Sequence, residues 1–315
     1  MVATNTSKAH NAKVNGGRHE MNLVKLIERF GSEDRCRDYL ETLRWPEGVT
    51  CPECGSTSIS RIKTRNQYDC NACRNRFSVK SGTALHDSHL PLWKWFLATY
   101  MMIESRKGIS ANQLKRTLGI TYKTAWFLCH RIRWAMGDQP PEPLEGIVEV
   151  DETFIGGKTS YAAGMREKTM VLGAIERDGR VVFKVSDSPT PKRHDLHQFV
   201  KQVVADDAEA IYTDGLQSYQ GIGTETRRHE TVSHRTEEWV RGDVGTQAIE
   251  SVWSLLDRSI IGSFHQLSVK HLPAYLDELS FRFNNRENPF LFRDTLVALL
   301  NSEGLTYEDL TAAGP

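Results

Sequence analysis

The chain has 315 residues, of which 39% are hydrophobic, and its 40 Lys and Arg balance 40 Asp and Glu. This length allows two or three domains with ordinary cores. The polar N-terminus lacks the apolar segment of a secretory signal, and the most apolar run, residues 95–103, is too short to span a bilayer, so we expect a cytoplasmic protein without a membrane partner.

The balanced total hides a charge asymmetry along the chain. Residues 51–138 contain 14 Lys and Arg against 5 Asp and Glu, a difference of +9, whereas residues 139–315 contain 18 against 28, a difference of −10. A basic region followed by an acidic one suggests a nucleic-acid-binding part joined to a cation-binding domain. The alternative is an uneven spread of solvated surface charge.

The N-terminal region is expected to contain a tail and then helices. Residues 1–19 are polar and predict a disordered tail. Residues 20–48 show helical spacing of apolar side chains, interrupted at Gly31 and Ser32, where Ser32 suits a helix N-cap. Cys36 and Cys129 lie in helical patterns and are expected to be plain buried residues.

Residues 49–82 contain two Cys-x-x-Cys pairs separated by 15 residues. This spacing is typical of a four-cysteine structural zinc site, and cysteines used in this way indicate a reducing compartment. A segment this small needs a metal to fold, so we expect one structural Zn²⁺ rather than free thiols. The expected ligands are Cys51, Cys54, Cys70 and Cys73.

Residues 88–137 predict helices that include a helix-turn-helix. Ser110 suits the N-cap of its first helix, Gly119 the turn and Thr121 the N-cap of the second. The exposed start of such a second helix is where base edges are contacted. A plain helical hairpin fits the same pattern. The candidate DNA-binding residues of this helix are Tyr122, Lys123, Thr124, Arg131 and Arg133.

Residues 138–145 are rich in Pro and predict a linker, after which the pattern becomes α/β. Strands are expected at 147–155, 169–176, 180–186 and 210–214, with a hairpin turn at Asp178 and Gly179. Helices are expected at 194–204 and 246–260, and residues 291–315 are expected to form a C-terminal helical tail.

Three acids lie on separate predicted elements of this α/β region. Asp151 lies inside the first strand, where a buried carboxylate is costly unless a partner such as a metal ion compensates it. Asp214 ends the fourth strand, and Glu250 lies on the late helix, with 35 residues between them. The order β-β-β-α-β-α with acids at these places predicts a ribonuclease-H-like α/β domain over residues 146–290. The alternative is that each acid is an ordinary surface residue.

Short motifs in this domain resemble a known family. They are Asp151-Glu152-Thr153-Phe154-Ile155-Gly156-Gly157-Lys158, Tyr212-Thr213-Asp214-Gly215, Ile249-Glu250-Ser251-Val252-Trp253-Ser254 and Phe281-Arg282-Phe283-Asn284-Asn285-Arg286. Together with the cysteine pairs, they resemble bacterial insertion-sequence transposases of the DDE type. More narrowly, they resemble the ISXO2-like group, which carries an N-terminal zinc ribbon and is related to the eukaryotic Merlin elements. The resemblance covers about residues 20–290.

The resemblance implies a DNA transposase that binds terminal inverted repeats and target DNA and uses two Mg²⁺ or Mn²⁺ ions. Asp151 would bridge the two ions, and Asp214 and Glu250 would complete one each. In the family a His near His234 accompanies the active site, which implies that His234 contacts the scissile phosphate; a structural His is the alternative. The resemblance also implies a homodimer or larger synaptic complex in a bacterial cytoplasm, associated with the nucleoid when bound to DNA.

The chain departs from the family pattern beside the expected site. Gln247, on the same helical side as Glu250, stands where the family commonly has Asn, and Asp257 followed by Arg258 stands where a Lys is usual. Arg258 is therefore a further candidate DNA contact. These departures leave open a decayed or repurposed copy that acts as a DNA-binding regulator, and a nuclease without transposition is the third reading.

Overall fold

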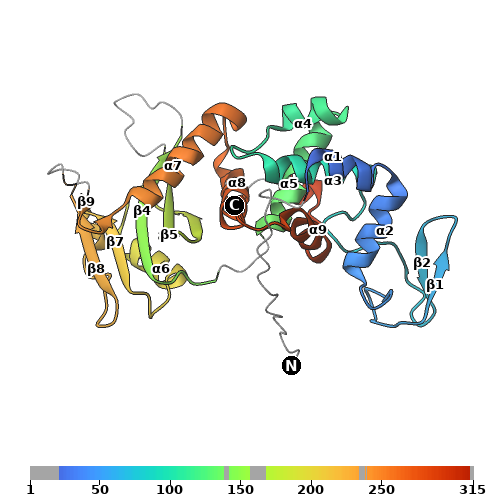
Figure 1. Ribbon diagram of the computed structural model, residues 1–315, viewed down its shortest axis with the longest axis horizontal. Coiled ribbons are helices and arrows are strands. Elements are labelled where there is room, and N and C mark those ends of the chain that lie inside the picture. The colour runs from blue at the N-terminus through green and yellow to red at the C-terminus, as the bar shows by residue number, and fades with distance from the viewer. Residues whose placement is uncertain (1–20, 138–141, 157–167, 234–237, 239, 313–315) are drawn as a thin grey trace.

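A small three-stranded segment, a helical part and a part built on a five-stranded sheet follow one another along the long axis of the molecule (Figure 1). The structure is a computed structural model that describes residues 21–137, 142–156, 168–233, 238 and 240–312. The expected tail, His234 and most of the Gly- and Lys-rich loop after the first acid lie outside these residues.

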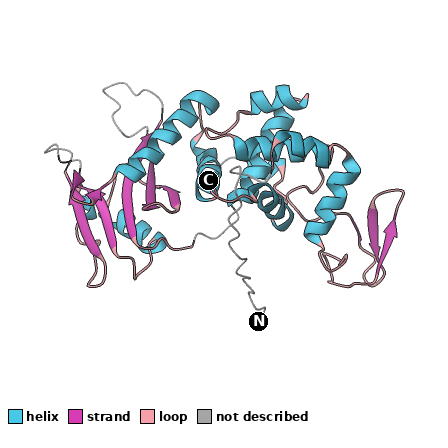
Figure 2. Ribbon diagram, in the orientation of Figure 1, coloured by secondary structure: helices cyan, strands magenta, loops and turns pink. Residues whose placement is uncertain are grey.

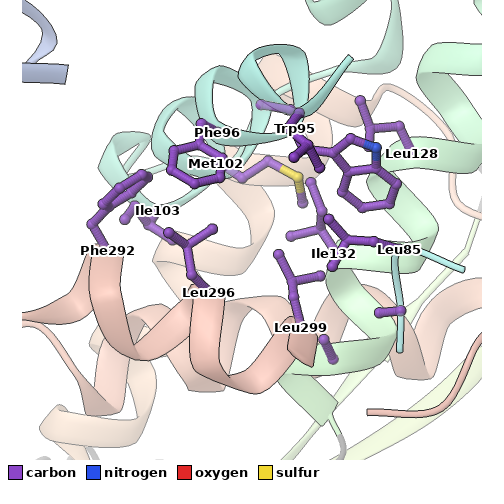
Figure 3. Packing of buried hydrophobic residues seen from close by; sticks show 14 of the residues in the cluster. Leu85, Trp95, Phe96, Met102, Ile103, Leu128, Ile132, Phe292, Leu296 and Leu299 are labelled. Atoms are coloured by element: carbon purple, nitrogen blue, oxygen red, sulfur yellow. The ribbon is translucent and has the colours of Figure 1, made fainter. Parts of the chain in front are cut away.

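The helical part has one core built from distant segments of the chain. Figure 3 shows Phe96 near Phe292 at one end of this core and Trp95 near Leu128 and Leu85 at the other. Its helices are α1 (Leu23–Phe30), α2 (Glu33–Arg44), α3 (Leu92–Glu104), α4 (Ala111–Leu118), α5 (Tyr122–Gly137) and α9 (Leu291–Asn301).

Local capping signals in the sequence start and end these helices as expected. The Ser32 side chain accepts a hydrogen bond from the Arg35 N–H at the start of α2, and Ser110 accepts one from the Gln113 N–H at the start of α4. Gly119 ends α4 in the left-handed region, with φ of 61°, and allows the chain to turn directly into α5.

The small segment beside α2 is an antiparallel three-stranded sheet of order β1-β2-β3. Its strands are β1 (Ile59–Ile62), β2 (Gln67–Cys70) and β3 (Arg76–Phe77). Tyr68 and Phe77 stack across β2 and β3 and, with Trp45, form a small aromatic core. So few apolar residues provide little burial, and this agrees with a need for a stabilising metal.

The larger sheet is mixed and has the order β6-β5-β4-β7-β8. The β4-β5 and β5-β6 pairs are antiparallel, whereas the β4-β7 and β7-β8 pairs are parallel. This arrangement is consistent with a ribonuclease-H-like fold. The strands are β4 (Ile147–Ile155), β5 (Thr169–Glu176), β6 (Val181–Val185), β7 (Ala210–Asp214) and β8 (Arg228–Val232).

Helices cover both faces of this sheet, as the cyan and magenta elements of Figure 2 show. Val148 and Val150 of β4 pack with α6 (Arg193–Val203) on one face. Val171 and Ile175 of β5 pack with α7 (Gln247–Ser259) and α8 (Leu272–Asn284) on the other. Neighbouring side chains on a strand point to opposite faces, so Asp151 points to the α7 face.

The last helices connect the sheet to the helical part. Helix α8 packs on both α5 and β6, and α9 then returns to the helical core. The region expected to form a C-terminal helical tail contains α9, whose Phe292, Leu296 and Leu299 are buried in the helical core. The expected linker between α5 and β4 is the other connection between the two parts. Its residue Leu144 is fully buried and forms an isolated parallel β-bridge with Val204, next to α6.

Short elements complete the described chain. They are η2 (Gln217–Tyr219), β9 (Val240–Arg241), β10 (Val244–Gly245), the π-helical turn η4 (Ile260–Phe264), η5 (Val269–His271) and α10 (Tyr307–Thr311). Among the helices of the described residues, none is both long and apolar enough to cross a bilayer.

Candidate functional site

The four paired cysteines converge at one end of the small sheet. Their sulfur atoms all lie within 4.8 Å of one another, and both the Cys51–Cys73 and the Cys54–Cys70 Sγ distances are 3.6 Å. Four thiolates at about 2.3 Å from a tetrahedral zinc ion would be about 3.8 Å apart, so this geometry fits Zn²⁺. Backbone N–H groups of Cys73 and Ala72 lower the pKa of the Cys70 thiol to about 6, which favours the metal-binding thiolate.

We expect one Zn²⁺ per chain and a Cys70→Ser variant that loses it. Without the metal, the three-stranded segment should unfold locally, because its aromatic core is too small to hold it together. Elemental analysis of protein purified without chelators measures the zinc, and limited proteolysis near residues 51–76 reports the unfolding. A Cys129→Ser variant is the control, since Cys129 is buried in the helical core. Zinc-free wild-type protein would contradict the assignment.

Asp151, Asp214 and Glu250 come from three elements and gather at the α7 side of the sheet. Asp151 lies inside β4, Asp214 ends the adjacent parallel strand β7, and Glu250 lies in the first turn of α7. Asp214 accepts a hydrogen bond from the Leu216 N–H at 3.0 Å, and Glu250 accepts one from the Thr246 hydroxyl at 2.9 Å. Both bonds hold the carboxylates in place.

Asp151 is oriented by Trp253, to which the sequence analysis gave no role in the site. The Trp253 Nε1–H donates a hydrogen bond to Asp151 Oδ2 at 2.9 Å. Gly173, which pairs with Asp151 across β4 and β5, makes room for this indole, because a Cβ there would lie 2.5 Å from Trp253 Cη2. The absence of a side chain at Gly173 therefore helps to position Asp151.

The acids affect one another electrostatically. Burial is the main cause that raises the pKa of Asp151 to about 6; the bond from Trp253 opposes this shift, and the charges of Asp214 and Glu250 add to it. A cation bound between these groups would relieve both the desolvation and the repulsion. Their ligand atoms are all oxygens, which suits a hard divalent ion such as Mg²⁺ or Mn²⁺.

The three carboxylates are not drawn tightly together. Within the ranges that the structure describes, the four cysteines are the only group of three or more His, Cys, Asp or Glu side chains whose ligand atoms all lie within 4.8 Å of one another. Repulsion between like charges favours this wider spacing.

A fourth acid, Glu152, lies next to this group and was missed by sequence reasoning. The hydroxyl of the buried Tyr219 donates a hydrogen bond to Glu152 Oε2 at 2.7 Å. Burial raises the pKa of Glu152 to about 7, the bond from Tyr219 opposes this, and the charges of Asp151 and Asp214 add to it. The only sequence signal for Glu152 was its position directly after Asp151. Because neighbouring side chains of a strand point to opposite faces of the sheet, that position placed Glu152 on the face away from the three acids.

The N-terminus of α7 is held by Glu149 of β4. Glu149 is 1% exposed, and its Oε2 accepts hydrogen bonds from the N–H groups of Ala248 at 2.7 Å and Ile249 at 3.1 Å. These are the two residues before Glu250. The carboxylate thus satisfies free N–H groups at the positive end of the helix and fixes where α7 starts relative to β4.

Arg177 extends this contact to β7. Its guanidinium donates to Glu149 Oε1 at 3.1 Å and to the Asp243 carbonyl at 2.8 Å, and it lies over the Tyr212 ring. The Tyr212 hydroxyl in turn donates to Asp243 Oδ2 at 3.0 Å. Glu149 and Tyr212 lie two residues before the candidate acids Asp151 and Asp214, and Glu149 also bonds to the start of α7, which carries Glu250. One hydrogen-bond network therefore contacts all three elements that carry the candidate acids.

The remaining candidates of α7 are on its surface. Gln247 is the first residue of the helix and is exposed, as are Asp257 and Arg258 near its other end. Arg258 Nη1 donates to the Ser254 hydroxyl one turn earlier.

The start of α5 is exposed, as expected for a DNA-reading helix. Thr121 accepts a hydrogen bond from the Thr124 N–H, and Tyr122 is 49% exposed. The Lys123 ammonium lies 4.1 Å from the centre of the Tyr307 ring of α10, which holds this cation by a cation–π contact.

Arg131 and Arg133 are corrections to the sequence-based set of DNA contacts. Arg131 is 5% exposed, lies over the Trp95 ring and donates to the His86 carbonyl. Arg133 is 2% exposed and pairs with the fully buried Glu278 of α8 at 2.7 Å. Both guanidinium groups are used inside the protein, because α5 is covered by α3, α8 and α9 along most of its length.

Comparisons with known protein families match two regions of the chain. Residues 143–284 match the model of the ISXO2-like transposase domain, and residues 31–76 match the model of the transposase zinc-ribbon domain. The chain is 30% identical over 277 residues to a protein of Halobacterium salinarum described as an uncharacterized protein in transposable element ISH50. The match covers 81% of this chain and 92% of that protein.

A solved structure is also similar, but distantly. It is the simian T-cell lymphotropic virus intasome in complex with a PP2A regulatory subunit, with 12% identity and a TM-score of 0.26. The match covers 59% of this chain and 66% of that one. At this TM-score the similarity carries no argument about fold or function.

Proposed function

Because the chain belongs to the family of ISXO2-like transposases, we propose that it is a DDE-type transposase with a ribonuclease-H-like catalytic domain. It binds the terminal inverted repeats of an insertion sequence in double-stranded DNA, cleaves a strand there and joins it to target DNA. The observation that carries this proposal is the gathering of Asp151, Asp214 and Glu250: burial is the main cause that raises the pKa of Asp151 to about 6, and the charges of Asp214 and Glu250 act in the same direction.

In the proposed reaction the chain supplies ligands and positions them. Asp151, Asp214 and Glu250 would together hold two Mg²⁺ or Mn²⁺ ions. The ions supply Lewis-acid stabilisation of the charge that develops on the reacting phosphate oxygens. The hydrogen bond from Trp253 holds the Asp151 side chain, and the bond from the Ala248 N–H to Glu149 fixes where the first turn of α7, which carries Glu250, lies relative to β4. Gln247, exposed one turn before Glu250, is placed to contact water or DNA beside this site.

Residues other than the three acids are proposed to contact the DNA. Tyr122, Lys123 and Thr124 at the exposed start of α5 read the inverted repeat as part of a helix-turn-helix, and Arg258 on α7 contacts the backbone near the acids. Two chains would be needed to hold both ends of an element, so a homodimer or larger assembly is part of the proposal.

The direct test mixes the protein with Mg²⁺, a labelled inverted-repeat end and a target plasmid. Joined product supports the proposal. Cleavage without joining would indicate a nuclease, and a mobility shift without cleavage would indicate a DNA-binding regulator. The same reaction with EDTA is the control, since loss of the divalent ion should stop cleavage.

Lys123→Ala is expected to weaken binding to the inverted repeat about tenfold, roughly 1.4 kcal/mol, because one cationic DNA contact is lost. Binding to unrelated DNA should change less. Lys94→Ala is a matched control, because Lys94 is also a surface lysine resting on an aromatic ring, that of Trp93. Equal affinities of the Lys123 variant and wild type in a mobility-shift titration would place recognition elsewhere.

A further inference from the structure

The motif Phe281-Arg282-Phe283-Asn284-Asn285-Arg286 at the end of α8 has no role in the proposed chemistry, yet it contacts both large parts of the molecule. Helix α8 lies between the five-stranded sheet and the helices α3, α5 and α9 (Figure 1). The contacts of the motif divide into two sets according to the part they reach.

The first two residues face the helical part. Phe281 packs against the helical core, and Arg282 is 8% exposed. The Arg282 guanidinium donates to the backbone carbonyls of Ser105 and Arg106, in the turn that follows α3. It also pairs with Glu278 at 3.3 Å, and Glu278 pairs with Arg133 of α5, so α8 is bound to two helices of that part.

Three other residues face the sheet. Phe283 packs in the core between α7 and the sheet. The Asn284 side chain accepts a hydrogen bond from the Val181 N–H at 2.7 Å and donates one to the Val181 carbonyl at 2.9 Å. Val181 starts the edge strand β6, so this amide takes the place of a neighbouring strand. Arg286 donates to the carbonyls of Gly179 and Asp178 in the β5-β6 turn.

Beside the motif the two parts do not pack directly. A cleft of about 790 Å³ separates Tyr100 and Ile103 of α3 from Leu255 of α7, and Arg282 and Arg286 also line it. Motion of one part against the other would close or open this cleft. The contacts of α8 resist such motion, together with a hydrogen bond from the Ser263 hydroxyl, in the turn after α7, to the Gly108 carbonyl.

We propose that this motif is a two-sided clamp that fixes the distance and angle between the DNA-binding helices and the three acids. It thereby determines which phosphodiester of a bound end reaches those acids. The role in choosing the phosphodiester rests on the proposed function. The positioning residues are Asn284 and Arg286 on the sheet side and Arg282 on the helical side.

The test uses the full chain with Asn284→Ala and Arg286→Ala combined. These changes remove the hydrogen bonds that hold β6 and the β5-β6 turn to α8. They keep the buried ion pairs of Glu278 with Arg133 and Arg282. Far-UV circular dichroism should match wild type, while small-angle X-ray scattering without DNA should show a broader range of overall dimensions. On a labelled inverted-repeat end, affinity should stay within about twofold, the cleavage rate should fall about tenfold or more, and cuts should spread over several neighbouring nucleotides.

Two further variants sharpen the result. Arg293→Ala, on the exposed side of α9, should behave as wild type in all assays, and Arg286→Lys, which keeps a cation near the turn, should lie between wild type and the double variant. If the double variant does not fold, Arg286→Ala alone is measured in its place. Wild-type scattering together with wild-type cut positions would overturn the clamp. If the wild-type protein does not cleave at all, the proposed function fails, and scattering still decides whether the motif holds the two parts together.

Discussion

Asp151→Asn and Asp214→Asn are each expected to reduce strand cleavage about 10³-fold or more, while affinity for the inverted-repeat end stays within about twofold. A thousandfold loss corresponds to about 4 kcal/mol of transition-state stabilisation, in the range expected when a catalytic ion loses an anionic ligand. Cleavage of a labelled end in Mg²⁺ measures the first effect, and a mobility shift measures the second. Activity within tenfold of wild type in either variant would refute the assignment.

The same substitution at Asp151 should change stability in the opposite direction. Because burial raises the pKa of Asp151 to about 6, this side chain favours the folded state when protonated, and that contribution is lost as pH rises from about 4 through 6. At pH 7 without metal, Asp151→Asn is therefore expected to unfold at a higher temperature, with a gain on the order of 2 kcal/mol. Mg²⁺ should stabilise the wild-type protein but not the variant, as thermal unfolding with and without Mg²⁺ can show.

The third acid can be separated from its neighbours on α7 by one set of variants. Glu250→Gln should abolish cleavage, because a neutral amide binds a hard divalent ion poorly. Gln247→Ala should lower cleavage only in part, and Asp257→Lys should leave it unchanged or raise it, because an exposed anion near DNA repels phosphates. Normal cleavage by Glu250→Gln, with an inactive Gln247 or Asp257 variant, would reassign the third ligand.

Glu149→Ala is expected to destabilise the fold by about 3–5 kcal/mol and to reduce cleavage at least about a hundredfold. The substitution removes a buried carboxylate, leaving the Arg177 guanidinium and the N–H groups of Ala248 and Ile249 without it. Helix α7 can then shift against β4, and Glu250 moves with it. Chemical denaturation measures the stability, and cleavage under conditions where the variant remains folded measures the positioning effect.

Two comparisons distinguish positioning from general loss of stability. Glu149→Gln keeps an acceptor for the helix N–H groups and loses the charge, so it should recover part of the cleavage while the pair with Arg177 stays weakened. Glu145→Ala, which changes an exposed acid four residues earlier on the chain, should leave both properties unchanged. If Glu149→Ala is destabilised but cleaves at the wild-type rate when folded, Glu149 does not position Glu250.

Much of the secondary structure and the zinc cluster followed from the sequence alone, because their signals are local. The two Cys-x-x-Cys pairs each place two thiolates in one tight turn, and the structure brings all four together. Ser110 and Gly119 define α4 through contacts with residues only a few positions away. The hairpin at Asp178 and Gly179 and the succession of elements along the chain from β4 to β7 followed from equally local patterns, whereas β8 was not predicted.

The tertiary structure decided which charged residues are available and what holds the acids. Helical pattern alone made Arg131 and Arg133 candidate DNA contacts, but α8 and α9, more than 100 residues later in the chain, bury that part of α5. Glu149 meets the start of α7 across about 100 residues, and Trp253 meets Asp151 through the space left by Gly173. Periodicity specifies which side of an element a residue occupies, but not which distant element packs against that side. Long-range packing therefore determined which arginines form internal ion pairs and which side chains position Asp151 and Glu250.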